Sequence, residues 1–336
     1  MQRFGQRFVL ARRPQGVPQA QDFRLETLPL PAVPDGGILI ATTHVSVDPG
    51  MRSRLSGDSY AAQLALGETI ESAGLGRVIE SRNPKFAAGD LVSGAFGWTT
   101  HLAHSGKGVL KLDPALYSGA VPPTCAIGIL GVPGLTGWFG VHALPDLKPG
   151  EVFLVSSAAG PVGATAGQIA KAKGATIIGI AGSDEKCAWL IDELGFDAVI
   201  NHRTTPDLSV SLQAAAPRGI DVYFDNVGGA MLDCAISNMR QNGRIVISGQ
   251  VAEYNAASPR GIRHVTDFIS KRLSMRGFVV LDYAAQFREA QAAMATMIRA
   301  GQIKFREQIV EGFEYLPTAF IGLFSGDNFG RCLVRV

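Results

Sequence analysis

The pattern of apolar and polar residues divides this chain into two parts. In the first hundred or so residues, apolar runs at 37–47, 74–80 and 90–95 are separated by turns rich in proline and glycine. Short runs of this kind between turn residues are typical of β-strands. We therefore expect the first part to form a β-rich domain that resembles a distorted barrel.

From about residue 125 the pattern changes to strands that alternate with helices. Turns and helix-period segments separate six short apolar strands, at 151–156, 176–181, 198–200, 221–225, 243–248 and 276–280. This alternation is typical of an α/β fold with a doubly wound parallel Rossmann sheet.

The end of the chain predicts how the two parts are connected. A helix is predicted at 284–300, where Gly301 ends it, and a strand-like tail follows from 304 to 336. We expect this tail to return to the first part. The sequence thus predicts a β-rich domain of residues 1–124 plus 304–336, into which an α/β domain of residues 125–303 is inserted.

A glycine turn follows the first strand of the α/β part. Gly160 and Gly163 occupy the second and third glycine positions of a GxGxxG pattern, with Ala158 at the first, and a helix-period segment runs over 164–173. Glycines there let a pyrophosphate approach the backbone and let the helix pack closely, while amides at the helix N-terminus bind phosphate. We expect contacts to a dinucleotide from Ala159, Gly160, Pro161, Val162 and Gly163.

The end of the second α/β strand indicates which dinucleotide is bound. Enzymes that use NAD usually carry an acidic residue there, whereas this chain has Gly182. Donors and cations that can surround a 2′-phosphate follow this strand and the next, at Ser183, Lys186, Asn201, His202 and Arg203. NADPH is therefore the expected cofactor. Two other interpretations stay open: Lys186 and Arg203 as ordinary solvated charges, and Asp184 as a displaced ribose acid.

Composition narrows the class of partner. The 31 basic and 29 acidic residues are spread along the 336-residue chain, so no basic patch predicts binding to nucleic acid or to a membrane. No apolar stretch reaches the roughly 20 residues of a membrane span, and the N-terminus lacks the apolar core of a signal peptide. We expect a cytoplasmic protein whose partners are small molecules or a second copy, with its four cysteines reduced.

Several motifs occur in order along the chain, among them Ser-Val-Asp-Pro at 46–49, Asp-Asn-Val-Gly-Gly at 225–229 and Asn-Phe-Gly at 328–330, with others at 132–136, 158–170 and 272–278. Over nearly the whole chain they resemble the zinc-free medium-chain dehydrogenase/reductases, in the branch of the prostaglandin reductases, leukotriene hydroxydehydrogenases and bacterial curcumin reductases. The resemblance implies a GroES-like catalytic domain, an NADPH-binding Rossmann domain, and a homodimer formed through the cofactor domains near 276–280.

A catalytic metal is not expected. Zinc alcohol dehydrogenases need cysteine, histidine and carboxylate ligands in the first domain, plus closely spaced cysteines for a structural metal. Here no cysteine precedes Cys125, and His44, His101 and His104 are scattered. Without a metal to polarise an alcohol, hydride transfer to a carbon–carbon double bond conjugated to a carbonyl is the more plausible reaction.

The resemblance implies that NADPH gives its hydride to the β-carbon of an α,β-unsaturated ketone or aldehyde, and that the enolate is then protonated at the α-carbon. Tyr254 occupies the place of a substrate-side tyrosine and is the catalytic candidate, although a ribose hydroxyl of the cofactor can also relay the proton. The resemblance also places Thr136, Asn226, Phe278, Val280 and Asn328 at the cofactor, and Met51, Arg52 and Trp98 with Tyr254 at the substrate.

This chain departs from the family pattern at Gly50 and His202, and at Trp138, which replaces a family tyrosine. Gly50 stands where the family has a tyrosine, which removes an aromatic wall from the substrate pocket, and His202 stands where prostaglandin reductases have a tyrosine. Three alternative functions stay open: a quinone oxidoreductase, an NADPH-binding protein with little turnover, and a methyltransferase, which Gly182 disfavours because such enzymes want an acid there.

Overall fold

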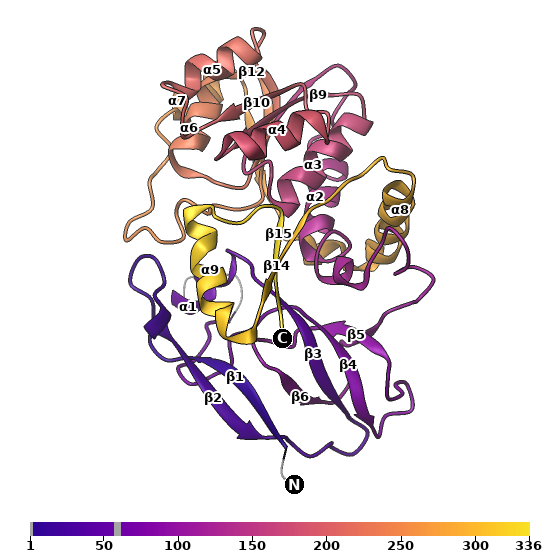
Figure 1. Ribbon diagram of the computed structural model, residues 1–336. Coiled ribbons are helices and arrows are strands. Elements are labelled where there is room, and N and C mark those ends of the chain that lie inside the picture. The colour runs from indigo at the N-terminus through magenta and orange to yellow at the C-terminus, as the bar shows by residue number, and fades with distance from the viewer. Residues whose placement is uncertain (1–2, 57–61) are drawn as a thin grey trace. The chain divides into compact units, whose positions relative to one another are not determined.

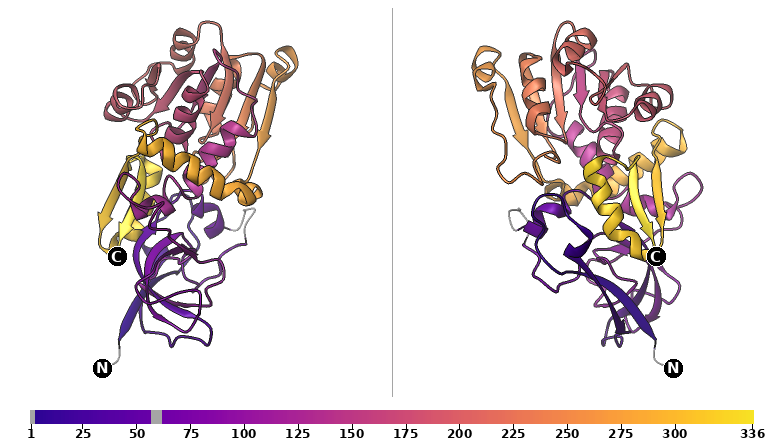
Figure 2. Two further views of the ribbon diagram at one scale, coloured as in Figure 1. Left: turned by 90° about the vertical axis from the view of Figure 1, so that its right-hand side faces the viewer. Right: turned by 60° about the vertical axis from the view of Figure 1, so that its left-hand side comes forward.

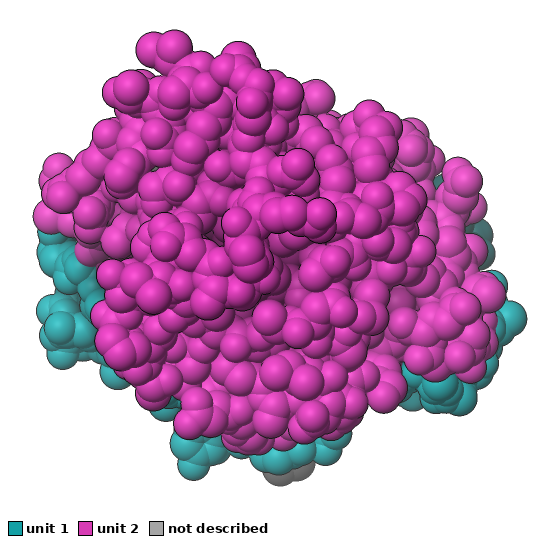
Figure 3. Space-filling view, turned by 90° about the horizontal axis from the view of Figure 1, so that it is seen from above, with its two compact units in different colours: residues 1–128, 307–328, 332–336 teal, residues 129–306, 329–331 magenta. Residues whose placement is uncertain are grey.

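The computed structural model describes residues 3–56 and 62–336, and these form two compact units (Figure 1). Unit 1 comprises residues 1–128, 307–328 and 332–336, and unit 2 comprises residues 129–306 and 329–331 (Figure 3). The chain therefore leaves unit 1, builds most of unit 2 and returns. The assignment of a catalytic role to the first unit and a cofactor role to the second stays a prediction.

Unit 1 is built on an antiparallel sheet and a hairpin. The sheet has the strand order β14-β15-β3-β4-β5-β7, with β6 paired to β3, and the hairpin joins β1 to β2. The strands are β1 (Phe4–Leu10), β2 (Phe23–Pro29), β3 (Ile38–Ser46), β4 (Gly74–Ser81), β5 (Leu91–Gly94), β6 (His101–His104), β7 (Leu110–Lys111), β14 (Glu307–Glu311) and β15 (Arg331–Arg335). Helical segments are α1 (Met51–Ser56), α9 (Leu316–Ser325), η1 (Ala20–Asp22), η2 (Pro123–Ile127) and η4 (Phe313–Tyr315).

The tail of the chain corrects one prediction. Residues 304–336 are not strand-like throughout, because α9 lies between β14 and β15. The reason is visible in its sequence: Leu316, Phe320 and Leu323 are apolar at helical spacing and buried, and Gly326 ends the helix in the left-handed conformation at φ 74°.

Unit 2 contains a six-stranded parallel sheet in the order β10-β9-β8-β11-β12-β13. In chain order this is 3-2-1-4-5-6, the doubly wound arrangement, so the predicted fold class is confirmed. The strands are β8 (Val152–Val155), β9 (Thr176–Ala181), β10 (Ala198–Asn201), β11 (Ile220–Asp225), β12 (Met239–Ile247) and β13 (Ser274–Gly277). The strand predicted at 276–280 thus begins and ends earlier, because η3 begins at Val280.

Helices cover both faces of this sheet (Figure 2). On one face, side chains of α5 and α6 pack with Ile178, Tyr223 and Ile245 in a buried cluster. The helical segments of unit 2 are α2 (Val132–His142), α3 (Pro161–Ala172), α4 (Asp184–Asp192), α5 (Leu208–Ala215), α6 (Gly229–Ser237), α7 (Val265–Ser270), η3 (Val280–Gln286) and α8 (Phe287–Arg299). Within the described ranges, no helix has the length and apolar character that crossing a membrane requires.

The close approach of α3 to the sheet depends on Gly167. A Cβ atom at this position would lie 2.2 Å from the ring of Phe196, and one at Gly179 in β9 would lie 3.0 Å from the same ring. Phe196 is buried and therefore wedged between helix and strand. A side chain at position 167 has no room unless the ring moves.

We predict that Gly167→Ala destabilises the protein. A contact of 2.2 Å is far inside the van der Waals distance, so we expect the upper part of the about 1–3 kcal/mol that overpacking costs. This exceeds the about 1 kcal/mol that alanine gains over glycine in a helix. Chemical denaturation of unit 2 measures the change in the free energy of unfolding. Gly261→Ala is the control, because a Cβ there meets nothing within 4 Å. A Gly167→Ala variant as stable as the control would contradict the wedge.

Candidate functional site

The buried carboxylate of Asp225 organises the carboxyl end of the parallel sheet in unit 2. It has no exposed surface and accepts hydrogen bonds from Ser156 Oγ at 3.1 Å and Tyr223 Oη at 2.7 Å. It also accepts from the backbone N–H groups of Val227 at 2.9 Å and Gly228 at 3.0 Å. Ser156 follows β8 and Asp225 ends β11, so this carboxylate joins the two strands at which the strand order reverses.

The protonation of this group follows from its surroundings. Desolvation raises the pKa of Asp225, and the donors of Gly228, Tyr223 and Val227 oppose that rise. Burial and the neighbouring carboxyl group raise the pKa of Tyr223 well above its ordinary value. The phenol of Tyr223 therefore keeps its proton and acts as a donor to Asp225.

Asn226 is fixed by the same strand end. Its backbone N–H donates to Ser156 Oγ at 2.9 Å, and its side-chain Nδ2 donates to the Ser156 carbonyl at 2.8 Å. The amide is half-buried. Asn226, which the family resemblance places at the cofactor, is therefore held by two bonds at the edge where dinucleotides bind in this fold.

The loop that carries Tyr254 is attached to the same turn. The N–H groups of Ser248 and Gly249 both donate to the carbonyl of Asp225, at 2.8 and 3.1 Å, and the N–H of Ala252 donates to Val227 at 3.0 Å. Tyr254 is half-buried, and its Oη accepts from the N–H of Gln250 at 3.3 Å. The structure thus brings Tyr254 and Asn226 to one region of unit 2.

The glycine turn has the features that a pyrophosphate requires. Gly160 caps α3 without a side-chain hydrogen bond, and Pro161 opens the helix, so amides of the first turn have no side-chain cap. A Cβ at Gly163 would lie 2.4 Å from the carbonyl oxygen of Ser157, so only glycine fits. Ala159 accepts at its carbonyl from the N–H of Gly330 at 3.1 Å, which ties a segment near the end of the chain to this turn.

The predicted 2′-phosphate residues also gather in unit 2. A Cβ at Gly182 would lie 3.2 Å from His202 Nε2 and 3.4 Å from Arg203 Nε. Ser183 caps α4 by accepting from the N–H of Lys186 at 3.3 Å. A side chain at position 182 would fill this space, so glycine leaves room for a ligand group beside three cationic or titratable residues. These residues fit a phosphate.

Asp184 is the residue that could serve instead as a displaced acid for the ribose hydroxyls. Its Oδ1 accepts from Asn201 Nδ2 at 2.7 Å, a bond that joins α4 to the end of β10. This bond gives Asp184 and Asn201 a structural role.

The remaining cofactor candidates lie elsewhere in the two units. Thr136, in α2, donates from Oγ1 to the carbonyl of Val132 at 2.7 Å. Phe278 is half-buried and meets Tyr283 edge-on, with ring centroids 6.5 Å apart. Val280 is buried at the start of η3, and Asn328 lies in unit 1 next to Phe329 of unit 2. Their contacts to a cofactor stay predictions.

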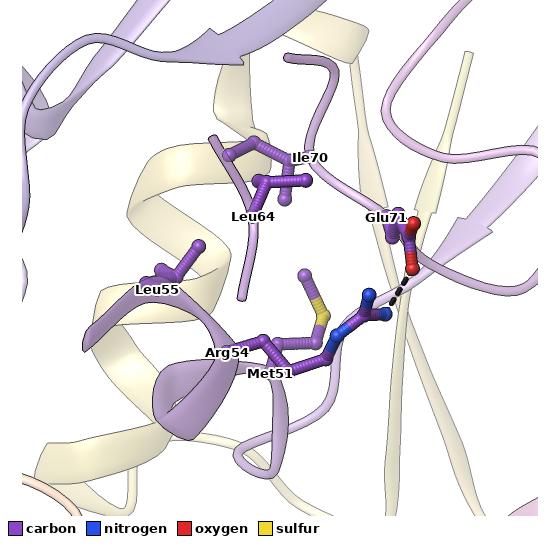
Figure 4. Close-up of a pocket in the computed structure, with 6 residues that line it drawn as sticks. All are labelled: Met51, Arg54, Leu55, Leu64, Ile70 and Glu71. Carbon is purple, nitrogen blue, oxygen red and sulfur yellow. Dashed lines mark hydrogen bonds and ion pairs between the residues drawn. The ribbon is translucent and has the colours of Figure 1, made fainter. Parts of the chain in front are cut away.

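Among the unit 1 candidates, Met51 lines a pocket. The pocket has apolar walls, an ion pair between Arg54 and Glu71 on one side, and the Met51 side chain between them (Figure 4). Arg52 is only 4% exposed, and its guanidinium donates to the carbonyls of Pro14 and Gly16. Met51 thus faces a small pocket, and its contact to a substrate stays a prediction, whereas Arg52 holds the chain around residues 14–16.

Trp98 requires a correction. It is 0% exposed and lies in the core of unit 1, where its ring meets Phe8, Phe23 and Phe320 at centroid distances of 5.2–6.0 Å. Aromatic rings attract one another at centroid distances of about 4.5–7 Å, so these contacts stabilise the buried ring. We therefore reassign Trp98 from the substrate to the core.

The comparisons with known proteins agree with this geometry. Residues 6–112 match the family model described as the N-terminal domain of oxidoreductase, and residues 161–296 match the model described as zinc-binding dehydrogenase. The chain is 40% identical to prostaglandin reductase 1 of Bos taurus over 324 residues, which cover 95% of both proteins. The chain belongs to the medium-chain dehydrogenase/reductases, in the prostaglandin reductase branch.

Other members of this reductase branch are similar over the same length. The NADPH-dependent curcumin reductase of Escherichia coli (strain K12) is 37% identical over 98% of this chain and 96% of that protein. The crystal structure of CurA from Vibrio vulnificus in complex with NADPH has a TM-score of 0.92 at 35% identity, and covers 98% of this chain and 99% of that one. Although one family model takes its name from zinc enzymes, the residues that the structure describes contain no cluster of three histidine, cysteine, aspartate or glutamate side chains that could hold a metal ion.

Sequence reasoning missed Asp225, Ser156 and Tyr223 as organisers of the site. One signal was available: Asp225 is the charged last residue of an otherwise largely apolar strand and precedes two glycines. The sequence does not show which donors meet a carboxylate, so the number of its hydrogen bonds could not be inferred.

We predict that Asp225→Ala destabilises unit 2 and weakens NADPH binding. The four donors all meet Oδ1 of Asp225, so alanine removes their common acceptor, and each unsatisfied buried donor costs about 1–3 kcal/mol. Thermal or urea unfolding measures the first effect and fluorescence titration with NADPH the second. Tyr223→Phe removes one of the four donors, so it should have the smaller effect; equal damage from both variants would contradict the role of Asp225 as the common acceptor.

Proposed function

We propose that this protein is an NADPH-dependent reductase of carbon–carbon double bonds conjugated to a ketone or aldehyde. The observation that carries the proposal is the arrangement at the carboxyl edge of the unit 2 sheet. There, the turn after β11 holds Asn226 and, through the loop after β12, Tyr254. Relatives of the same branch that are similar over the whole chain carry the names prostaglandin reductase and NADPH-dependent curcumin reductase.

The residues of unit 2 would hold NADPH at its two charged groups. The turn from Ala159 to Gly163 would take the pyrophosphate, and Lys186, His202 and Arg203 would take the 2′-phosphate. When bound, NADPH supplies a hydride for the β-carbon of the substrate. The protein contributes position and electrostatic stabilisation.

Tyr254 would act on the substrate carbonyl. As the β-carbon gains a hydride, negative charge develops on the carbonyl oxygen, and a phenol that donates a hydrogen bond stabilises it. The Tyr254 oxygen already accepts from the N–H of Gln250, so its own proton can point to another acceptor. Met51 would contribute to the substrate pocket, and Gly50, around which a Cβ would meet nothing within 4 Å, leaves that region open for a bulky substrate.

The experiment that tests this function follows NADPH oxidation with a panel of enones, enals and quinones, and compares NADPH with NADH. We expect turnover of enones and enals with a preference for NADPH. Turnover of quinones alone would favour the quinone oxidoreductase, and tight NADPH binding without turnover would favour the binding protein.

In the same assay, we predict that Tyr254→Phe lowers kcat for an enone about 10- to 100-fold, which is the usual range for loss of one donor or proton-transfer group, while the Kd of NADPH stays unchanged. Tyr315→Phe is the control, because Tyr315 is 50% exposed in unit 1. An unchanged kcat in Tyr254→Phe would assign the proton relay to the cofactor ribose instead.

We also propose a homodimer. β13 is an edge strand that pairs with β12, its four residues are exposed, and Met275 is an exposed apolar residue within it. An open edge strand of this kind is a template for pairing with a second copy. A cytoplasmic location stays a prediction.

A charge on this edge should weaken the dimer. We predict that Met275→Lys shifts the protein from dimer to monomer in sedimentation velocity at micromolar concentration, because a lysine on an edge strand opposes strand pairing. Val210→Lys is the control: Val210 is 61% exposed and lies on α5 of the same unit. A wild-type protein that sediments as a monomer would contradict the dimer itself.

A further inference from the structure

A histidine and a glycine lie beside one another at the ends of neighbouring strands of unit 2. His202 follows β10, and its backbone N–H donates to the carbonyl of Ala181, the last residue of β9, at 3.0 Å. Nε2 of His202 and Nε of Arg203 both lie within 3.4 Å of the place that a Cβ on Gly182 would take. The ring nitrogen and the guanidinium therefore face the same space above Gly182.

The charges that face this space are mainly positive. Lys186 lies in the first turn of α4, next to the positive end of that helix, and Arg203 follows His202 directly. Two carboxylates also lie in that first turn, but each has another donor. Asp184 accepts from Asn201 at 2.7 Å, and Glu185 lies 3.6 Å from the guanidinium of Arg306, which itself stacks on Phe329. An anion is the ligand that this surface favours.

The imidazole differs from its two cationic neighbours because it titrates near neutral pH. Partial burial, Arg203 and Lys186 lower the pKa of His202, so the ring is mostly neutral near pH 7, although its outer side is exposed to solvent. A phosphate dianion beside the ring has the opposite effect and favours the protonated form. The imidazolium then donates hydrogen bonds from both nitrogens.

We propose that His202 is a specificity-determining residue whose imidazole takes up one proton when the 2′-phosphate of NADPH binds, so that the preference for NADPH over NADH grows as the pH falls. The proton comes from solvent or buffer and stays on the ring while the phosphate is bound. This proposal rests on the proposed function, since it takes the 2′-phosphate of NADPH as the anion.

The sign of the pH dependence follows from linkage. The phosphate raises the affinity of the ring for a proton, so the pKa of His202 is higher in the complex than in the free protein. Between these two values, NADPH affinity rises as the pH falls, by up to tenfold per pH unit for one proton. Below the pKa of His202 in the free protein, the ring is already charged, and the affinity for NADPH no longer changes with pH. NADH has no 2′-phosphate, so its affinity does not follow this change.

The test is isothermal titration calorimetry of the full chain with NADPH and with NADH, from pH 6 to 8.5, in two buffers of different ionisation enthalpy. The difference between the buffers gives the number of protons taken up. We expect net uptake with NADPH near neutral pH and none with NADH. The 2′-phosphate has a second pKa of about 6, so it releases protons of its own when it binds near that pH. The His202→Gln variant measures this phosphate contribution to the proton count.

His202→Gln should lose the additional uptake and bind NADPH about tenfold more weakly at pH 6, a change that fades toward pH 8.5, while NADH binding stays constant. Lys186→Met is the matched control. It removes a cation that does not titrate in this range, so it should weaken NADPH binding at every pH and keep the proton uptake.

The outcomes separate this proposal from the proposed function. If wild type and His202→Gln take up the same number of protons with NADPH, the proposal is wrong, while tighter binding of NADPH than of NADH still supports the cofactor. If NADPH binds no more tightly than NADH in any variant, the cofactor assignment itself fails, and with it the reason for a phosphate at His202.

Discussion

The buried carboxylate of Asp225 is the interaction on which the site in unit 2 depends. Moving a carboxylate from water into the protein interior costs several kcal/mol of folding free energy. Each hydrogen bond to a charged group contributes about 1.5–3 kcal/mol of stabilisation. The four donors, from Ser156, Tyr223, Val227 and Gly228, are therefore sufficient to offset the cost. Removing one donor is tolerable, whereas removing the acceptor leaves all four without their common partner.

This carboxylate has consequences for function because chain segments are attached to it in series. The carboxylate fixes the turn at 226–228. The backbone carbonyls of Asp225 and of that turn accept hydrogen bonds from the loop after β12, and this loop carries Tyr254. The position of a phenol that would act on a substrate carbonyl thus depends on a carboxylate that is fully buried in unit 2. Preorganisation of this kind lets a single hydrogen bond stabilise developing charge without reorganisation during the reaction.

The sequence predicted the sheet of unit 2 well and individual side-chain roles less well. The strand at 176–181 was predicted at its observed bounds, because β9 is covered on both faces and reads as a continuous apolar run. The helix α9 is not predicted, because a short, largely apolar run such as Leu316–Ser325 suits a buried strand as well as a helix. Trp98 could not be placed from sequence, because the rings that bury it come from β1, from the start of β2 and from α9, all distant along the chain. The role of Asp225 depends likewise on donors from two strands and a turn.

The measurement that tests the central claim most directly is the fate of the hydride. An enone is reduced with NADPH that carries deuterium at the transferred position, and the product is analysed by NMR. The account predicts deuterium at the β-carbon of a saturated ketone, and, when the reaction is run in D₂O with unlabelled NADPH, deuterium at the α-carbon. Deuterium at the carbonyl carbon, in an alcohol that retains its double bond, would contradict it.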